Sequence, residues 1–176
     1  MKLCDRGICM KMFLILCFFT AVTLAQGLKQ FSNERVGISF SYPAEWEFTN
    51  ENEYLLEMNE EDSDINVTLN FVITASSDME ETFRILISES QQANYADSVM
   101  KEVISSLAAI GDTMKVEGSN FLKIHQDYGP VSITYYLHNE GRRFVYAIAT
   151  VVNKDKALLA KNDKVIQSIK FLSKEQ

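Results

Sequence analysis

The sequence has few of the residues that mark disordered, fibrous or disulfide-stapled proteins. Only two of its 176 residues are proline and seven are glycine, whereas 47% are hydrophobic and 11% are aromatic. A disordered or collagen-like chain has the opposite balance, so the composition indicates a globular protein with enough apolar side chains for a core. The length fits one domain with at most a small appendage.

The chain also lacks the positive charge of a nucleic-acid-binding protein. Its formal net charge is −7, so nothing in the charge balance favours DNA or RNA as a partner. The charges are nevertheless unevenly placed. No lysine or arginine lies between Arg35 and Arg84, which enclose twelve acidic residues, whereas residues 154–174 hold six lysines. One part of the surface is therefore expected to be acidic and another basic.

Residues 1–25 have the features of a secretory signal peptide. Lys11 precedes an apolar run over residues 12–24, which has the length of a signal's hydrophobic segment and is short for a membrane span. Thr23-Leu24-Ala25 places small residues at both positions that signal peptidase recognises. We therefore expect cleavage after Ala25, a single domain over residues 26–176, and a secreted or periplasmic protein without a stable membrane span. An uncleaved, membrane-anchoring helix is the alternative.

Cysteine is absent from the expected mature chain. Cys4, Cys9 and Cys17 all lie within the leader, and Leu16 in front of Cys17 is too large for a lipoprotein anchor. Disulfides, thiol catalysis and cysteine metal sites are thus excluded from the exported form. No cofactor is expected, because the chain also lacks the glycine pattern of phosphate-binding loops and the motifs of zinc proteases and serine hydrolases.

Alternating apolar residues predict a mainly antiparallel sheet. The pattern places Ile38, Phe40 and Tyr42 on one face of a strand, and Pro43 ends that strand because it has no N–H to donate. Residues 65–74 alternate more clearly than any other segment. Further strands are expected at residues 54–58, 114–117, 121–126, 131–137 and 143–151, separated by polar or glycine-containing turns.

Helical spacing of apolar residues predicts two helices and leaves one segment ambiguous. Residues 96–108 carry apolar side chains three and four positions apart, and Gly111 follows as the expected stop. A second helix is expected over residues 157–169. In residues 77–90 a capping box favours a helix, although the apolar residues there also alternate as in a strand. The helix is the preferred interpretation.

The predicted strand 143–151 is apolar on both faces. Phe144, Tyr146 and Ile148 occupy one face, and valine and alanine residues occupy the other. A strand of this kind is covered on both sides. We therefore predict an α+β fold, a three-layer α/β/α sandwich in which two helices cover opposite faces of a mainly antiparallel central sheet.

Two motifs near the ends of the expected mature chain resemble those of the PsbP-like superfamily, which includes PsbP, Mog-like and DcrB-like proteins. Residues 37–46 hold an alternating strand that ends in Tyr42-Pro43, with Trp46 three residues later, and residues 166–171 are similar to the family's closing helix. The resemblance implies an α/β/α sandwich that binds partners rather than catalysing a reaction. The leader favours the bacterial envelope or secreted branch of the superfamily.

The histidines and acidic residues give only weak indications of a metal site. His125 and His138 each lie in a predicted strand, where a structural role is the simpler interpretation. A zinc site would require the two rings to meet near Asp127 or Glu140. Residues 62–66 alternate oxygen-bearing side chains like a calcium loop, but the required glycine and glutamate are missing from the positions that follow. No metal ligand is therefore assigned.

The predicted partner-contact patch consists of three tyrosines and two arginines: Tyr128, Tyr135, Tyr136, Arg142 and Arg143. Tyrosine and arginine are enriched at protein interfaces, where a few such side chains carry much of the binding energy. The simpler alternative is that Tyr135 or Tyr136 packs beneath a helix.

Three functional hypotheses follow from the sequence. The first is a non-enzymatic interaction protein whose partner is another envelope or secreted protein. The second is a small-ligand or metal-binding protein that uses a cleft at the sheet edge, and the third is a hydrolase, for which no nucleophile–base pair is visible. Tyr42, Pro43 and Trp46 are assigned a structural role, with the indole closing one end of the core instead of stacking on a ligand.

Overall fold

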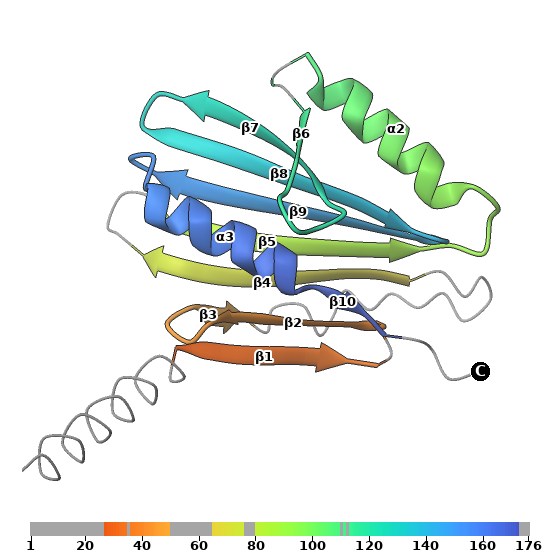
Figure 1. Cartoon of the computed structure of the whole chain (residues 1–176), viewed down its shortest axis with the longest axis horizontal. Coiled ribbons are helices and arrows are strands. Elements are labelled where there is room, and N and C mark those ends of the chain that lie inside the picture. Colours follow the sequence, from red (N-terminus) through yellow and green to blue (C-terminus); the bar gives the residue numbers. More distant parts are fainter. Residues whose placement is uncertain are drawn as a thin grey trace, which may run out of the picture.

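Strands dominate the computed structural model, which describes residues 27–34, 36–49, 65–75, 80–109, 111 and 113–172 (Figure 1). The strands are β1 (Leu28–Asn33), β2 (Ile38–Pro43), β3 (Glu47–Thr49), β4 (Ile65–Ala75), β5 (Glu80–Glu89), β6 (Thr113–Lys115), β7 (Leu122–Tyr128), β8 (Val131–Glu140), β9 (Arg143–Val152) and β10 (Lys170–Phe171). The helices are α2 (Tyr95–Leu107) and α3 (Lys156–Ser168). The predicted leader, the predicted strand 54–58 and residues 62–64 of the calcium-like loop lie outside the described residues.

The larger sheet has seven strands in the order β3-β4-β5-β9-β8-β7-β6, and every neighbouring pair is antiparallel. The clearest predicted strand, residues 65–74, is confirmed as β4. The predicted meander is also confirmed, because β7, β8 and β9 follow one another through short turns at residues 129–130 and 141–142.

The two helices cover opposite faces of this sheet, as predicted. On one face Phe144 of β9 packs with Ala96 and Leu107 of α2. On the other face, Val145 of β9 belongs to the same core cluster as Ile166 of α3. The strand that is apolar on both sides is therefore buried between two helical layers. Within the described part of the chain, neither helix is long and apolar enough to cross a membrane.

A second, three-stranded sheet lies on the α3 side of the molecule, in the order β1-β2-β10 (Figure 1). The predicted closing helix is wrong at its end, because α3 stops at Ser168 and Ile169 is already extended. Lys170 and Phe171 then pair with Ser39 and Ile38 of β2. Pairing with β2 gives the backbone of this tail the hydrogen bonds that another helical turn would otherwise supply.

The preferred helix over residues 77–90 is also wrong, because residues 80–89 form β5. Phe83, Ile85 and Ile87 are each at most 1% exposed and face the same core. A period of two places these three side chains on one side of a strand, whereas a helix would spread them around its axis. β5 pairs with β4 and β9 along its length, which makes it a central strand.

The sequence predicted that Gly111 would end α2, but in the structure Gly111 does not cap the helix. The helix ends at Leu107, and the Ala108 N–H donates to the Ile104 carbonyl over 2.7 Å. Gly111 lies so close to β7 that a Cβ atom at this position would stand 2.7 Å from the His125 carbonyl oxygen. The glycine is therefore needed for close backbone approach after the helix has ended.

The Trp46 indole lies in the core at the end of the larger sheet. It is 1% exposed, and its ring centroid lies 5.3 Å from that of Phe83 and 6.1 Å from that of Phe71. The backbone N–H of Trp46 donates to the Pro43 carbonyl over 3.1 Å, so the proline turn sets the position of the tryptophan. Phe48 continues the alternation and packs on Phe71 at 5.0 Å.

Candidate functional site

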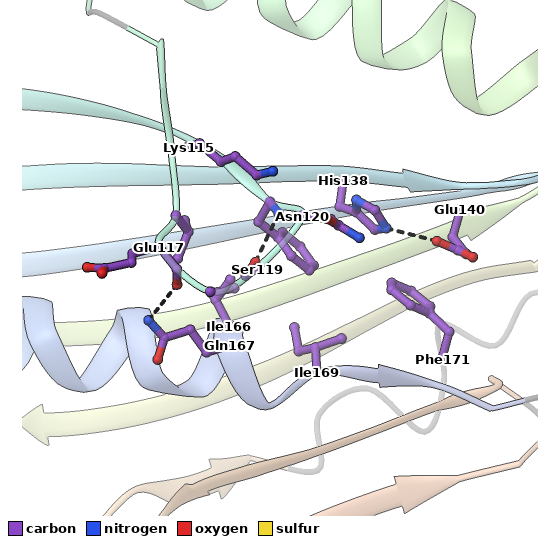
Figure 2. Close-up of a pocket in the computed structure, with 13 residues that line it drawn as sticks. Lys115, Glu117, Ser119, Asn120, His138, Glu140, Ile166, Gln167, Ile169 and Phe171 are labelled. Carbon is purple, nitrogen blue, oxygen red and sulfur yellow. Dashed lines mark hydrogen bonds and ion pairs between the residues drawn. The ribbon is translucent and has the colours of Figure 1, made fainter.

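A cleft of about 600 Å³ opens between the C-terminal end of α3, β10 and the turn that joins β6 to β7 (Figure 2). We call it the β10 cleft. Buried or half-buried apolar residues form its floor: Val116, Phe121, Ile166, Ile169 and Phe171. Polar side chains surround them: Lys115, Glu117, Ser119, Asn120, His138, Glu140 and Gln167. An apolar surface with a few converging polar groups is typical of ligand-binding clefts.

The wall of the cleft formed by residues 116–121 is held in place by short-range hydrogen bonds. The Val116 N–H donates to the Phe121 carbonyl over 2.9 Å, and the Phe121 N–H donates to Ser119 Oγ over 2.9 Å. Gln167 Nε2 donates to the Glu117 carbonyl over 2.9 Å and ties this turn to α3 (Figure 2). The wall therefore exists before any ligand binds, which reduces the entropy lost on binding.

His138 forms one end of the cleft and packs against two aromatic rings. Its ring centroid lies 4.9 Å from that of Phe121 and 5.2 Å from that of Phe171. Its Nε2 lies 3.1 Å from Glu140 Oε2, and the imidazole is 9% exposed. The packing agrees with the structural role expected for this histidine, but the ring also lines the cleft.

Arg143 joins the two sheets beside the cleft. Its guanidinium donates to Glu89 Oε2 of β5 over 3.0 and 3.1 Å and to the Gly37 carbonyl, just before β2, over 2.7 Å. The same guanidinium lies 5.9 Å from the centre of the Phe171 ring. Gly37 has a φ of +70°, and a Cβ atom there would stand 2.7 Å from Arg143 Nη2, so this contact requires glycine.

The structure places two members of the predicted contact patch in the interior. Arg143 is 8% exposed, as described above, and Tyr136 is 0% exposed. The Tyr136 hydroxyl donates to Asp163 Oδ1 over 2.8 Å, and Lys123 Nζ pairs with Asp163 Oδ2 over 2.7 Å. Burial and the neighbouring carboxylate raise the pKa of Tyr136 well above its ordinary value. This tyrosine packs beneath α3, which was the simpler alternative.

The other three members of the patch are separated along β8. Tyr128 is 53% exposed and lies at the β7–β8 turn, whereas Arg142 lies at the β8–β9 turn and bonds to Gln91. Tyr135 is half-buried between these ends and stacks on Tyr146. Burial raises the pKa of Tyr146 to about 12. The five predicted residues therefore do not form one contiguous surface.

His125 and His138 lie on the same face of the sheet but in different surroundings. His125 Nδ1 is 2.8 Å from Thr134 Oγ1, and its Nε2 is 3.4 Å from Asp127 Oδ1. His125 lines a separate cavity of about 230 Å³, whereas His138 lines the β10 cleft and pairs with Glu140. Within the described residues, no group of three or more His, Cys, Asp or Glu side chains could hold a metal ion.

Strand register explains why the His125 imidazole lies beside a hydroxyl and a carboxylate. Thr134 stands directly opposite His125 in the β7–β8 pair, and Asp127 lies two positions further along the same strand face. Polar cross-strand pairs of this kind stabilise sheets. Thr134 is 2% exposed, which places its hydroxyl poorly for attack on a substrate, so we assign the group a structural role.

Sequence reasoning did not identify the β10 cleft. Its lining residues come from the β6–β7 turn, the end of β8, the last turn of α3 and β10, so no single motif contains them. The polar turn at residues 118–120 was recognised only as a turn. The one available signal was Phe171, an isolated apolar residue beyond the helix that apolar spacing predicts over residues 157–169.

Comparisons with known proteins establish a likeness in fold. No protein-family model and no curated protein matches the sequence. A crystal structure of a protein from Bacteroides thetaiotaomicron VPI-5482 is similar over 86% of this chain, with a TM-score of 0.59 and 15% identity; this chain spans 50% of that protein's length. The solution structure of cyanobacterial PsbP (CyanoP) from Synechocystis sp. PCC 6803 covers 82% of this chain and 92% of its own, with a TM-score of 0.49 and 12% identity.

These likenesses concern the fold alone. The chain has an α+β sandwich fold with mainly antiparallel sheets, which it shares with the Bacteroides protein over most of its own length.

Proposed function

We propose that this chain is an exported, non-enzymatic binding protein that receives an extended segment of a partner protein in the β10 cleft. The observation that carries the proposal is the cleft itself, whose apolar floor accommodates side chains and whose polar rim offers hydrogen bonds to a peptide backbone. The expected leader favours another envelope or secreted protein as the partner.

The strand next to the cleft supports recognition of an extended peptide. β10 is one of the two edge strands in the order β1-β2-β10 among the described residues. An edge strand presents backbone groups with which an incoming strand pairs, and alternate side chains of the incoming strand enter pockets. Ile169 and Phe171 both line the cleft, so a peptide beside β10 would contact them.

A small ligand is the second candidate occupant of the same cleft. Its volume of about 600 Å³ falls within the range of about 300–1,000 Å³ that is typical of small-molecule sites, and Lys115 of the edge strand β6 borders it. His138 and Glu140 could orient such a ligand. His138 and Glu140 supply only two possible metal ligands, whereas zinc sites have three or four protein ligands.

Site-specific cross-linking tests the proposal in the natural compartment. A photoreactive residue is placed at Asn120, on the exposed rim of the cleft, or at Gln92, an exposed position before α2 that serves as the control. We expect a protein-sized adduct from position 120 and none from position 92. The partner identified from that adduct should then slow amide hydrogen exchange in Lys170 and Phe171 when it binds the purified protein.

Two outcomes would contradict the partner proposal. Equal adducts from positions 120 and 92 would show non-specific contact, and the absence of any adduct from position 120 would remove the partner from this cleft. In the latter case, a small molecule that raises the melting temperature of the wild type, but not of an Asn120→Trp variant, would support the small-ligand alternative.

Export gives a further testable expectation. The exported protein is expected to begin at Gln26, because Thr23-Leu24-Ala25 has the small residues that signal peptidase recognises. Intact-mass analysis of the secreted or envelope fraction measures this directly. An Ala25→Arg variant is the control and should accumulate with its leader attached. A wild-type exported protein that retains residues 1–25 would refute cleavage at this site.

A further inference from the structure

A second cleft, of about 450 Å³, lies on the other flank of α3, between the helix and the β1–β2 hairpin. We call it the lysine cleft. Its lining residues are Gly27, Leu28, Ser41, Pro43, Glu45, Lys161, Lys164, Val165 and Ser168. Apolar atoms make up most of this lining, and Leu28 at the cleft is 68% exposed, whereas Pro43 and Val165 are buried. A single exposed leucine is ordinary on a protein surface, but here it extends an apolar cavity.

The charged groups of the lysine cleft leave one cation without a partner among the described residues. Lys161 Nζ lies 2.7 Å from Glu45 Oε1, and this hydrogen bond lowers the pKa of the Glu45 carboxyl. Lys161 and Glu45 therefore neutralise each other. Lys164, one helical turn further along α3, is exposed and forms no ion pair with any residue in the described ranges.

The solvent-facing side of α3 adds to this positive charge. Lys156, at the start of α3, is also exposed and forms no ion pair with another described residue. The two acidic residues of the region are occupied elsewhere, since Asp155 accepts from the first backbone N–H groups of the helix and Asp163 binds Lys123 and Tyr136. The basic surface expected from the lysines of residues 154–174 is therefore found on α3.

An apolar cavity beside an ammonium group that no described residue pairs with selects a class of ligand. A small hydrophilic anion would leave the apolar surface around Leu28 unused, and a neutral hydrocarbon would leave Lys164 unused. We propose that the lysine cleft binds a fatty carboxylate, with its hydrocarbon chain between α3 and the β1–β2 hairpin and its carboxylate beside Lys164. Apolar burial would supply most of the affinity, and the ion pair would select the charge of the head group.

This site is separate from the β10 cleft, although both use α3. Val165 and Ser168 face the lysine cleft, whereas Ile166 and Gln167 line the β10 cleft. Binding of a fatty carboxylate is therefore independent of the proposed partner segment, and either proposal can fail alone.

Three ligands with the same ten-carbon chain test the proposal: decanoate, decan-1-ol and decylammonium. Each ligand is titrated into the exported protein at concentrations below the ligand's critical micelle concentration or solubility limit. Changes in backbone NMR chemical shifts then report where it binds. We expect saturable decanoate binding with shifts at Leu28, Ser41 and Val165, weaker binding of the alcohol and the weakest binding of the amine. The backbone chemical shifts of His138 and Phe171, which line the β10 cleft, should not change.

Charge reversal on α3 provides the decisive comparison. Lys164→Glu is expected to weaken decanoate binding by about three- to tenfold and to reverse the preference for decanoate over decylammonium. Lys156→Glu is the matched control, because Lys156 is exposed on the same helix and does not line the cleft; its effect should stay below about twofold. Leu28→Gln should weaken all three ligands alike, since Leu28 contributes only apolar surface.

Several results would overturn the assignment. They are non-saturable binding of decanoate, equal effects of Lys164→Glu and Lys156→Glu, or shifts confined to His138 and Phe171. Binding to anionic phosphatidylglycerol vesicles without binding to monomeric decanoate would instead make this face a membrane-surface contact and refute the carboxylate site.

Discussion

Trp46→Ala is expected to leave the protein marginally stable or unfolded. The indole is 1% exposed and packs against Phe71 of β4 and Phe83 of β5, so truncation would open a large cavity beside these two rings. Replacing a buried tryptophan by alanine costs about 3–5 kcal/mol, a large share of the roughly 5–15 kcal/mol that stabilises a typical domain. We therefore expect a large loss in the free energy of unfolding.

Denaturant unfolding measures this loss, and Trp46 itself is the reporter in the wild type because the sequence has one tryptophan. Its native emission should be blue-shifted and move to the red on unfolding, while circular dichroism follows both variants. Trp46→Phe is the matched control. It keeps a ring in the cavity and removes the indole N–H, which no described residue accepts, so its cost should be clearly smaller. Water-like native emission, with a cost below about 1 kcal/mol for alanine, would place the indole on the surface.

Arg143→Ala is expected to destabilise the protein by about 3–5 kcal/mol, because breaking a buried ion pair leaves its other charge in the interior. Arg143 and Glu89 have side chains that are 9% and 14% exposed, so solvent screens this pair weakly. The substitution also removes the hydrogen bond to the Gly37 carbonyl and the cation above the Phe171 ring. We therefore expect a weaker contact between the two sheets as well as a lower free energy of unfolding.

The neighbouring arginine provides a matched control for this prediction. Arg142 is exposed, so Arg142→Ala should cost less than about 1 kcal/mol. A double variant, Arg143→Met with Glu89→Met, should recover part of the loss because both buried charges are removed. Hydrogen exchange should accelerate in β2 and β10 of Arg143→Ala. Equal costs for Arg142→Ala and Arg143→Ala would show that the buried contacts contribute no more than a surface arginine.

The sequence pattern predicted those elements whose local period agrees with their tertiary contacts. The alternation in residues 65–74 and the double-sided apolar strand 143–151 both gave the correct structure, because burial on one or both faces is written directly into such patterns. Residues 80–89 carried both periods at once. The pairing of β5 with β4 and β9 decided between them, and sequence periodicity does not contain that pairing.

The short strands depend even more on pairing that sequence periodicity does not reveal. β10 has two residues and exists because Ile38 and Ser39 offer partners to Phe171 and Lys170 from the other end of the chain. β1 is mostly exposed, so its sequence carries little apolar alternation to detect. The β10 cleft was missed for a related reason, since its walls meet only after distant segments have packed together.

For the contact patch, the identity of the residues was a poor guide to their position. Tyr136 and Arg143 have the side chains typical of interfaces, yet both lie on the core side of their strands and form internal hydrogen bonds. Tyr135, the neighbour of Tyr136 in β8, points to the other face, as alternation along a strand requires, whereas Arg142 lies in the turn before β9. The strands were predicted correctly, but which face would meet α3 depended on the packing of the helix.

The central position of β2 in the small sheet has a consequence for the order of folding. Ser41 of β2 bonds to Ser168 at the end of α3, 127 positions away, and β10 adds its pairing beyond that point. Contacts between such distant segments form late, because the entropy of closing the intervening loop is lost before they are made. During synthesis, β1 and β2 emerge before α3 and β10, and the edge of β2 that later pairs with β10 stays unpaired until that segment has been made. A chaperone that covers this edge, or rapid completion of the chain, would protect the protein from premature strand pairing.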